Sequence, residues 1–232
     1  MDNLKKILMN KDIGKCLDFG TRNGEFLFRL KKNVDSFEEL IGIDNNKKTI
    51  KKMNKLNKER VKFIYMDGYN TDFPDEYYDA VSISNTLHHL NYRDRMLKEM
   101  YRVLKKDGYF FINEMFYDSN DGPKKTHGLM HILEAEIDRE LGVVHNKTFT
   151  KNEIINIAES LNLKSLVYEE YNESEEYNKK LYKKYKNFKN KLLKVKDSPN
   201  YSYFKYKADE IDENFKLYGI ERCKQLLIVG KK

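Results

Sequence analysis

The chain has a glycine-containing turn, Asp18–Gly24, between an apolar segment and a predicted helix. Gly20 and Gly24 would let the backbone pass close to a ligand, and the start of a helix offers unpaired N–H donors. Such a turn at a strand end is expected to bind a nucleotide-type ligand. Arg22 stands in place of the second glycine of Gly-x-Gly-x-x-Gly, and Gly24 comes too soon, which argues against NAD or FAD.

Polar residues also end the next three predicted strands. Asp44 lies about 20 residues beyond the turn, where a carboxylate accepts hydrogen bonds from both ribose hydroxyls. The alternative for Asp44 is an ordinary helix N-cap. Asp67 and Gly68 follow the third strand and are candidates for binding an adenine amino group, and Asn85 follows the fourth. Because parallel strands end at one edge of a sheet, we expect these residues to border one crevice.

All five histidines lie between residues 88 and 145. His89 follows the fourth predicted strand and is a candidate general base or substrate-orienting group. Its alternative role is a structural hydrogen bond that holds the loop. Glu114 ends the fifth predicted strand and is a candidate to orient a substrate or polarise a base.

A second polar set is spaced as on one face of a helix. His127, His131, Glu134 and Asp138 fall within an arc of about 60°. Three interpretations stay open: a solvent-exposed face with ion pairs within the helix, a substrate site, or a shared divalent metal. We assign no metal ligand, and the pattern is not His-Glu-x-x-His, which excludes a metalloprotease. His145 could close over the same pocket.

Strand–helix alternation predicts the elements that position these residues. It runs through residue 115 and indicates a parallel sheet with helices on both faces. The predicted strands are 15–20, 38–44, 61–67, 78–85, 108–116, 163–171 and 221–230, and the predicted helices include 2–10, 24–32, 45–60, 92–106 and 150–161. Asp107 and Gly108 are expected to close the helix 92–106, with glycine as the left-handed cap. Thr150 and Glu153 form a predicted capping box.

Residues 172–219 form an insertion between the last two predicted strands. Its segment 179–196 has nine lysines and no acidic residue, with an apolar stripe at helical spacing: Leu181, Tyr185, Phe188, Leu192 and Val195. This predicts an amphipathic helix with a lysine-rich outer face. That face is either simply solvated, which we favour, or binds a partner or an anionic substrate.

Bulk properties narrow the class of protein. The chain has 232 residues, a formal net charge of +7 and a pI of about 9.0. A nucleic-acid partner is therefore an open alternative, but lysine, asparagine, isoleucine and tyrosine are abundant throughout, so we do not favour it. No apolar stretch approaches the roughly 20 residues that span a bilayer, which predicts no membrane partner. The N-terminus does not resemble a signal peptide and the two cysteines lack metal-ligand spacing, so we expect a cytoplasmic protein.

Residues 14–115 resemble the class I methyltransferases, particularly the type 11 small-molecule methyltransferases. LDFGTRNG (17–24) looks like the family's Asp-x-Gly-x-Gly-x-Gly loop with Arg22 as its middle residue, and GID (42–44) and MDG (66–68) look like the ribose and adenine segments. YDAVSISNTLHHL (78–90) and RVLKKDGYFFINE (102–114) resemble two further segments, with Asp107 in place of the family's proline. Five such segments occur in the family's order.

The resemblance implies a Rossmann-like α/β fold with a seven-stranded, mostly parallel sheet and a helical cap or insertion. It implies S-adenosyl-L-methionine as cofactor, held by Asp18, Phe19, Gly20, Thr21, Arg22, Gly24, Asp44, Asn45, Met66, Asp67, Gly68 and Asn85. The expected activity is methyl transfer to a small-molecule acceptor by in-line displacement, with His89 and Glu114 as candidate catalytic residues. His127, His131, Glu134, Asp138 and His145 are the acceptor-site candidates.

We expect one domain over residues 1–232, with a cofactor-binding core at 1–115 and helical acceptor or cap segments at 116–150 and 172–219. Two alternatives remain. One is an RNA or protein methyltransferase, which the basic charge favours, although SNTLHH (84–89) lacks the Asn/Asp-Pro-Pro-Tyr/Phe loop of nucleic-acid amino methyltransferases. The other is a protein that binds S-adenosylmethionine without catalysis.

Overall fold

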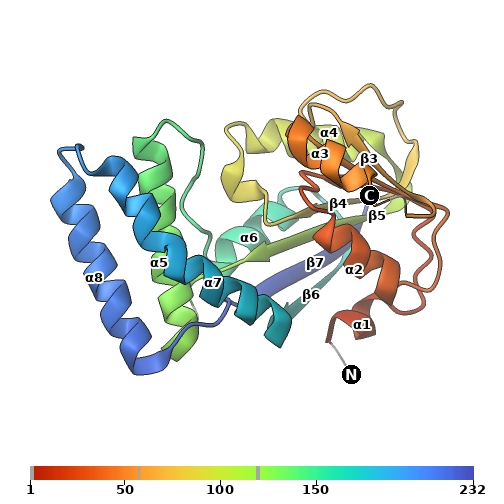
Figure 1. Ribbon diagram of the computed structural model, residues 1–232. Coiled ribbons are helices and arrows are strands. Elements are labelled where there is room, and N and C mark those ends of the chain that lie inside the picture. Colours follow the sequence, from red (N-terminus) through yellow and green to blue (C-terminus); the bar gives the residue numbers. More distant parts are fainter. Residues whose placement is uncertain (1–2, 57, 119–120) are drawn as a thin grey trace.

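The computed structural model describes residues 3–56, 58–118 and 121–232, and within them a seven-stranded sheet forms the centre of the protein (Figure 1). The strands are β1 (Lys15–Phe19), β2 (Glu39–Asp44), β3 (Val61–Tyr65), β4 (Tyr78–Ser84), β5 (Leu104–Met115), β6 (Lys164–Tyr171) and β7 (Gln225–Lys231). Their order across the sheet is β3-β2-β1-β4-β5-β7-β6. β1 to β5 pair in parallel, and β7 is antiparallel to both β5 and β6. The predicted fold class is confirmed.

Helices cover both faces of the sheet because successive strand residues point to opposite sides. The helices of the sheet layer are α1 (Asn3–Leu8), α2 (Glu25–Asn33), α3 (Lys47–Asn54), α4 (Arg93–Val103) and α6 (Lys151–Glu159). Cys16 and Phe111 pack in the core formed with α1, α2 and α3. Leu17 and Ile112 pack in the core formed with α4 and α6. Asp18 therefore faces the α2 side, and Glu114 faces the same side of the sheet as Ile112.

The insertion forms a separate helical group with the segment that follows β5. It comprises α5 (Gly122–Glu140), α7 (Glu175–Leu192), the short helix η2 (Leu193–Val195) and α8 (Tyr201–Tyr218), which lie together beside the sheet (Figure 1). The predicted apolar stripe is largely buried here, since Leu181, Phe188, Leu192 and Val195 pack against α5 and α8 and Tyr185 is partly buried. The lysine-rich face of α7 points outward. Among the residues described, no helix is both long enough and apolar enough to cross a membrane.

Two predicted helix ends are wrong because contacts with neighbouring strands end the helices earlier. The helix expected over 92–106 ends at Val103, and Leu104 already pairs with Tyr78 in the sheet. The left-handed residue there is Asp107, with φ of 62°, and not Gly108. A side chain at Gly108 would instead approach the Asp79 carbonyl to 2.9 Å, so glycine is needed for close packing.

The helix expected over 45–60 is the shorter α3. It begins after Asn46, whose side chain accepts from Thr49 N at 3.1 Å, and it ends at Asn54. The Asn54 side chain donates to the Phe63 carbonyl at 2.9 Å, which holds the end of the helix against β3. The capping box of Thr150 and Glu153 is confirmed.

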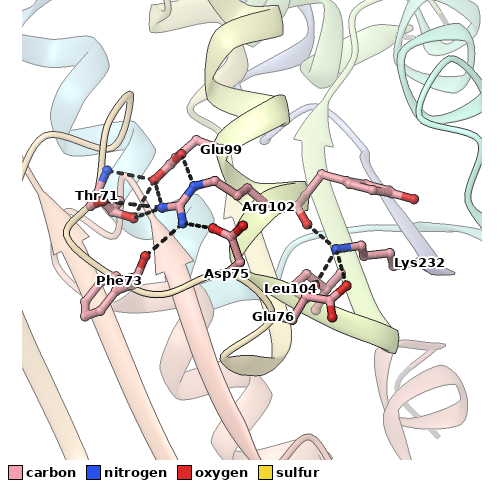
Figure 2. Close-up of polar contacts among 9 residues, drawn as sticks. Thr71, Phe73, Asp75, Glu76, Glu99, Arg102, Leu104 and Lys232 are labelled. Carbon is pink, nitrogen blue, oxygen red and sulfur yellow. Dashed lines mark hydrogen bonds and ion pairs between the residues drawn. The ribbon is translucent and has the colours of Figure 1, made fainter.

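One charged network attaches the loop after β3 to α4 (Figure 2). Glu99, 9% exposed, accepts from Thr71 N at 2.7 Å and from Arg102 Nε and Nη2 at 2.8 and 2.6 Å. Arg102 also donates to the Phe73 carbonyl at 2.9 Å and to Asp75 at 2.5 Å. Because this loop continues from the Asp67 segment, the network fixes one border of the cofactor side of the sheet.

A glutamine at Glu99 would keep an acceptor oxygen but remove the charge that Arg102 binds. We expect Glu99→Gln to lower the free energy of unfolding by about 1–3 kcal/mol at neutral pH, measured by urea denaturation. The matched control is Glu76→Gln, which removes an exposed ion pair with Lys232 (Figure 2) and should cost no more than about 1 kcal/mol. Equal stability of the two variants would contradict the assigned role of Glu99.

The same pair has a pH signature. Burial alone would raise the pKa of Glu99, but the hydrogen bonds from Arg102 and Thr71 lower it to about 2, from an ordinary value of 4.5. The stabilisation is therefore complete above the ordinary value and is lost as pH falls from there toward the lowered one. Glu99→Gln should show a shallower loss of stability over that acid range.

Candidate active site

The turn after β1 has the backbone conformation that glycines favour. Gly20 and Gly24 have φ of 66° and 70°, and a Cβ on Gly20 would come within 2.5 Å of the Thr86 side chain. Arg22 has φ of 48°, so a residue with a Cβ occupies a left-handed position that carries steric strain. The Arg22 side chain is exposed, and Arg22 is one of the residues that line the cleft described below.

Asp44 joins the end of β2 to this turn. Its Oδ2 accepts from Arg22 N at 2.9 Å and its Oδ1 from Asn46 N at 2.8 Å. The N-cap of α3 is Asn46, so the alternative of Asp44 as an ordinary N-cap is wrong. Each carboxylate oxygen keeps a further lone pair, and the side chain is half-exposed, so it can accept hydrogen bonds from a diol.

Asp18 is buried at the floor of the site. It is 2% exposed, and its Oδ1 accepts from Ser82 Oγ on the neighbouring strand at 2.6 Å. Burial raises the pKa of Asp18 to about 6, although the hydrogen bond from Ser82 favours the charged form. A carboxylate held at this cost in an otherwise polar cleft is suited to pair with a cationic group of a ligand.

A cleft of about 570 Å³, open solvent at its mouth included, lies at the carboxyl ends of β1, β4 and β5. Of the predicted cofactor residues, the cleft is lined by Asp18, Gly20, Thr21, Arg22 and Asn85. Asn85 accepts from Met115 N at 3.1 Å, which ties the end of β4 to β5.

The other predicted cofactor residues lie outside this cleft. Phe19 is fully buried in the core, so only its backbone is available to a ligand. Asp44 and Asn45, and Met66, Asp67 and Gly68, follow along the ends of β2 and β3. Met66 N donates to the Asp44 carbonyl at 3.2 Å, which joins the two segments into a continuous rim beside the cleft.

The cleft also has a wall of ion pairs that the sequence interpretation missed. Arg29 of α2 contacts Glu173 Oε2 at 2.5 Å and Tyr171 Oη at 3.1 Å. Arg222 lies 3.9 Å from Glu173 and 3.8 Å from Glu25, and the Glu173 side chain is only 3% exposed. The four-residue spacing of Glu25 and Arg29 on α2 was the one local sequence pattern that could have indicated this ion-pair wall. Glu173 and Arg222 flank the insertion, and no spacing connects them to the turn.

The histidines gather beside this cleft, directly after Asn85 and Thr86. Ring centroids are 4.2 Å apart for His88 and His89, 4.3 Å for His89 and His145, and 4.9 Å for His131 and His145. His127 is 6.0 Å from His131. The solvent-exposed interpretation of the α5 stripe is wrong for His127, His131 and Glu134, which are 2%, 7% and 4% exposed. Contacts from Cys223, Thr148 and Lys184 cover these side chains.

Four of the histidines have a defined partner at Nδ1. Glu114 Oε1 contacts His88 Nδ1 at 2.9 Å, and its Oε2 accepts from Leu87 N at 3.1 Å. Glu114 therefore orients His88 and not His89, the candidate base. The remaining pairs are His145 Nδ1 with Asp138 Oδ2 at 2.7 Å, His131 Nδ1 with Thr148 Oγ1 at 2.8 Å, and His127 Nδ1, which accepts from Cys223 N at 3.0 Å. Glu134 instead pairs with Lys184 of α7 at 2.5 Å. The residues of the α5 stripe thus contact different partners and do not form one site.

The pKa is lowered at His89, His127, His131 and His145. Burial lowers the pKa of His127 and His131 well below the ordinary value. Burial also lowers the pKa of His145, although Asp138 opposes this effect. Desolvation by the surrounding protein lowers the pKa of His89. Repulsion from His88, His145 and Arg22 acts in the same direction. Near neutral pH these side chains therefore offer nitrogen lone pairs and carry no positive charge.

Comparisons with known proteins agree with the fold and the turn. Residues 17–112 match a family described as a methyltransferase domain. The chain is 29% identical over 162 residues to carboxy-S-adenosyl-L-methionine synthase of Nautilia profundicola, covering 67% of this chain and 65% of that protein. It is 29% identical over 110 residues to demethylmenaquinone methyltransferase of Thermotoga maritima, covering 47% of each chain. The chain thus spans less than two thirds of the length of these relatives.

Among solved structures, the YcgJ protein of Bacillus subtilis superposes with a TM-score of 0.62 over 99% of this chain and 95% of its own, at 18% identity. At that identity the likeness concerns the fold. The family match covers the Asp18–Gly24 turn, Asp44, Asp67 and Asn85, the residues around which the site is built. Residues 17–112 are therefore similar to a methyltransferase domain, and the similarity includes the turn and the polar strand ends.

Proposed function

We propose that the protein transfers a methyl group from S-adenosylmethionine to a small-molecule acceptor. The observation that carries this proposal is the cleft between Asp18 and Asn85, which adjoins the histidine cluster. When bound, S-adenosylmethionine supplies a methyl group activated on a sulfonium centre. The chain's own residues must then bind both molecules, align them and exclude water.

The residues present fit this cofactor. Asp44 has free lone pairs for the ribose hydroxyls, and Asp67 and Gly68 lie beside it for the adenine. Gly20 leaves room that a Cβ would fill, and Asp18 is a buried carboxylate for an ammonium group. The guanidinium groups of Arg29 and Arg222 line the far wall and can bind a carboxylate. The amino-acid end and the nucleoside end of the cofactor thus each have complementary groups.

The acceptor is proposed to lie between the cleft and the helical group. The segments 116–150 and 172–219 cover the histidines, and His89 is the exposed member nearest the cleft. A neutral His89 can orient the acceptor or accept a proton, with His131 and His145 behind it. The Thermotoga maritima relative is named for a quinone substrate, which supports a small-molecule acceptor for this chain.

Three other functions are distinguishable by experiment. An RNA methyltransferase would bind RNA with strong salt dependence. A binding protein without catalysis would bind S-adenosylmethionine and turn over no acceptor. The Nautilia profundicola relative is named as a synthase that makes a carboxylated form of the cofactor, so mass spectrometry of the cofactor after incubation would identify that activity.

We predict that Asp44→Ala weakens binding of S-adenosylhomocysteine by about 10- to 100-fold, because the ribose hydroxyls lose a charged acceptor. Isothermal titration calorimetry measures the change. Asp35→Ala is the control and should bind as the unmodified protein does, because Asp35 is exposed and lies near the amino end of β1, where its N–H donates to the Lys11 carbonyl. Unchanged affinity in Asp44→Ala, with the fold intact by circular dichroism, would contradict the cofactor assignment.

A second prediction concerns pH. Because burial raises the pKa of Asp18 to about 6, the carboxylate becomes protonated as pH falls through that value. Its attraction for the ammonium group is then lost, so the affinity for S-adenosylhomocysteine should fall between about pH 7.5 and 5. Asp18→Asn should bind S-adenosylhomocysteine more weakly than the unmodified protein at about pH 7.5. Its affinity should change little as the pH falls from about 7.5 to 5. The other charged groups of the cleft are common to both proteins, so the same pH slope in both would refute the pairing.

A further inference from the structure

We propose that His88, His89 and His145 form a binding site for a divalent transition-metal ion, with Zn²⁺ as the best match. One nitrogen from each of the three side chains lies within 4.8 Å of the other two. Imidazole nitrogen is a preferred ligand of Zn²⁺, and three histidines with one open position are the ligand set of a catalytic zinc site. The site differs from the α5 stripe in which the sequence allowed a metal.

The carboxylates behind the cluster support this inference. His88 Nδ1 contacts Glu114 Oε1 at 2.9 Å, and His145 Nδ1 contacts Asp138 Oδ2 at 2.7 Å. Since a carboxylate only accepts, each Nδ1 carries the proton and each Nε2 keeps its lone pair. A carboxylate behind the histidine is the usual arrangement around protein-bound zinc, because it fixes the tautomer and the ring orientation.

The Nε2 atom of His145 is the second, independent observation. It is buried and has no hydrogen-bond partner in the part of the chain that the structure describes. The side chain is 5% exposed, and its ring lies 4.3 Å from His89 and 5.5 Å from His88. A buried polar atom without a partner costs free energy. A metal ion bound between these rings would satisfy it.

The dimensions allow the site to close without a change of fold. Zn–N bonds of about 2.0–2.1 Å in tetrahedral geometry place the ligand nitrogens about 3.4 Å apart. The separations, at most 4.8 Å, are wider than this, so small rotations of the rings suffice. The loop that carries His145 is already held against the first two histidines, because Asn146 N donates to the His88 carbonyl at 2.7 Å.

The neighbouring histidines are not part of the group whose nitrogens lie within 4.8 Å of one another. His127 Nδ1 accepts from Cys223 N, and His131 Nδ1 is engaged by Thr148. His127 also lies beyond His131, at 6.0 Å from its ring. His127 is therefore the matched control within the same cluster. An acceptor with an oxygen anion would occupy the open position of the metal, and this further role alone rests on the proposed methyl transfer.

The test is zinc binding by the full-length protein after treatment with a chelator. Calorimetry with ZnCl₂ should find one equivalent bound, and CoCl₂ should produce the intense visible absorption of a tetrahedral cobalt site. His145→Gln and His89→Gln should weaken zinc binding by more than about 100-fold, and Asp138→Asn by about 10- to 100-fold. His127→Gln, which keeps an acceptor for Cys223 N, should bind zinc as the unmodified protein does.

Binding of S-adenosylhomocysteine by each variant serves as the folding control, and it separates this proposal from the proposed function. No stoichiometric zinc in the unmodified protein would overturn the metal site, and so would equal zinc affinity in His145→Gln. Loss of zinc in His127→Gln as large as in His145→Gln would also overturn it, because the ligands would then not be the assigned three. Failure to bind S-adenosylhomocysteine with normal zinc binding would instead refute only the cofactor assignment.

Discussion

The reversal of strand order between β1 and β4 is the constraint on which the rest of the site depends. From β1 the chain builds outward through β2 and β3, then returns to the other side of β1 with β4 and β5. The loops after β1 and β4 therefore diverge and leave a crevice at their carboxyl ends. Asp18 and Ser82 lie side by side on its floor because these strands are neighbours, in a register that pairs the two residues. The glycines of the turn and the left-handed Asn85 keep the entrance open.

The antiparallel β7 connects the helical group to that crevice. Because β7 lies between β5 and β6, the insertion that precedes it must leave the sheet at Tyr171 and return at Gln225. Both ends of the insertion therefore meet the cleft, where Glu173 and Arg222 form its far wall with Arg29. The same route places α7 over α5 and closes the space in which the histidines gather. The cleft and the space that holds the histidines are thus shaped by one connection.

Charge is distributed differently in the two halves of the site. The cofactor half holds ionised groups, with Asp18 buried at a raised pKa and the arginines paired with Glu25 and Glu173. In the histidine half, burial and mutual repulsion oppose the protonation of His131 and His145. This division suits a reaction in which a cationic donor meets an acceptor that must be desolvated. It also leaves the lone pairs that a metal ion would require.

The sequence by itself determined the sheet, the turn and the polar strand ends, because these depend on local periodicity and on glycines at short spacing. Asp18, Gly20, Asp44 and Asn85 could be placed on one edge from that pattern alone. The ends of α3 and α4 could not be predicted from the sequence pattern, because strand pairing and side-chain hydrogen bonds to neighbouring strands decide them.

Only the tertiary structure decided how the histidines are used. Helical spacing grouped His127 and His131 with Glu134 and Asp138. Packing instead places His88, His89 and His145 together. Glu134 forms an ion pair with Lys184. The ion-pair wall of Arg29, Glu173 and Arg222 was also invisible, since its members are up to 193 residues apart in the chain. The physical reason is the same in both cases. Periodicity describes one helix face, but which loop covers that face depends on the path of the chain through the whole sheet.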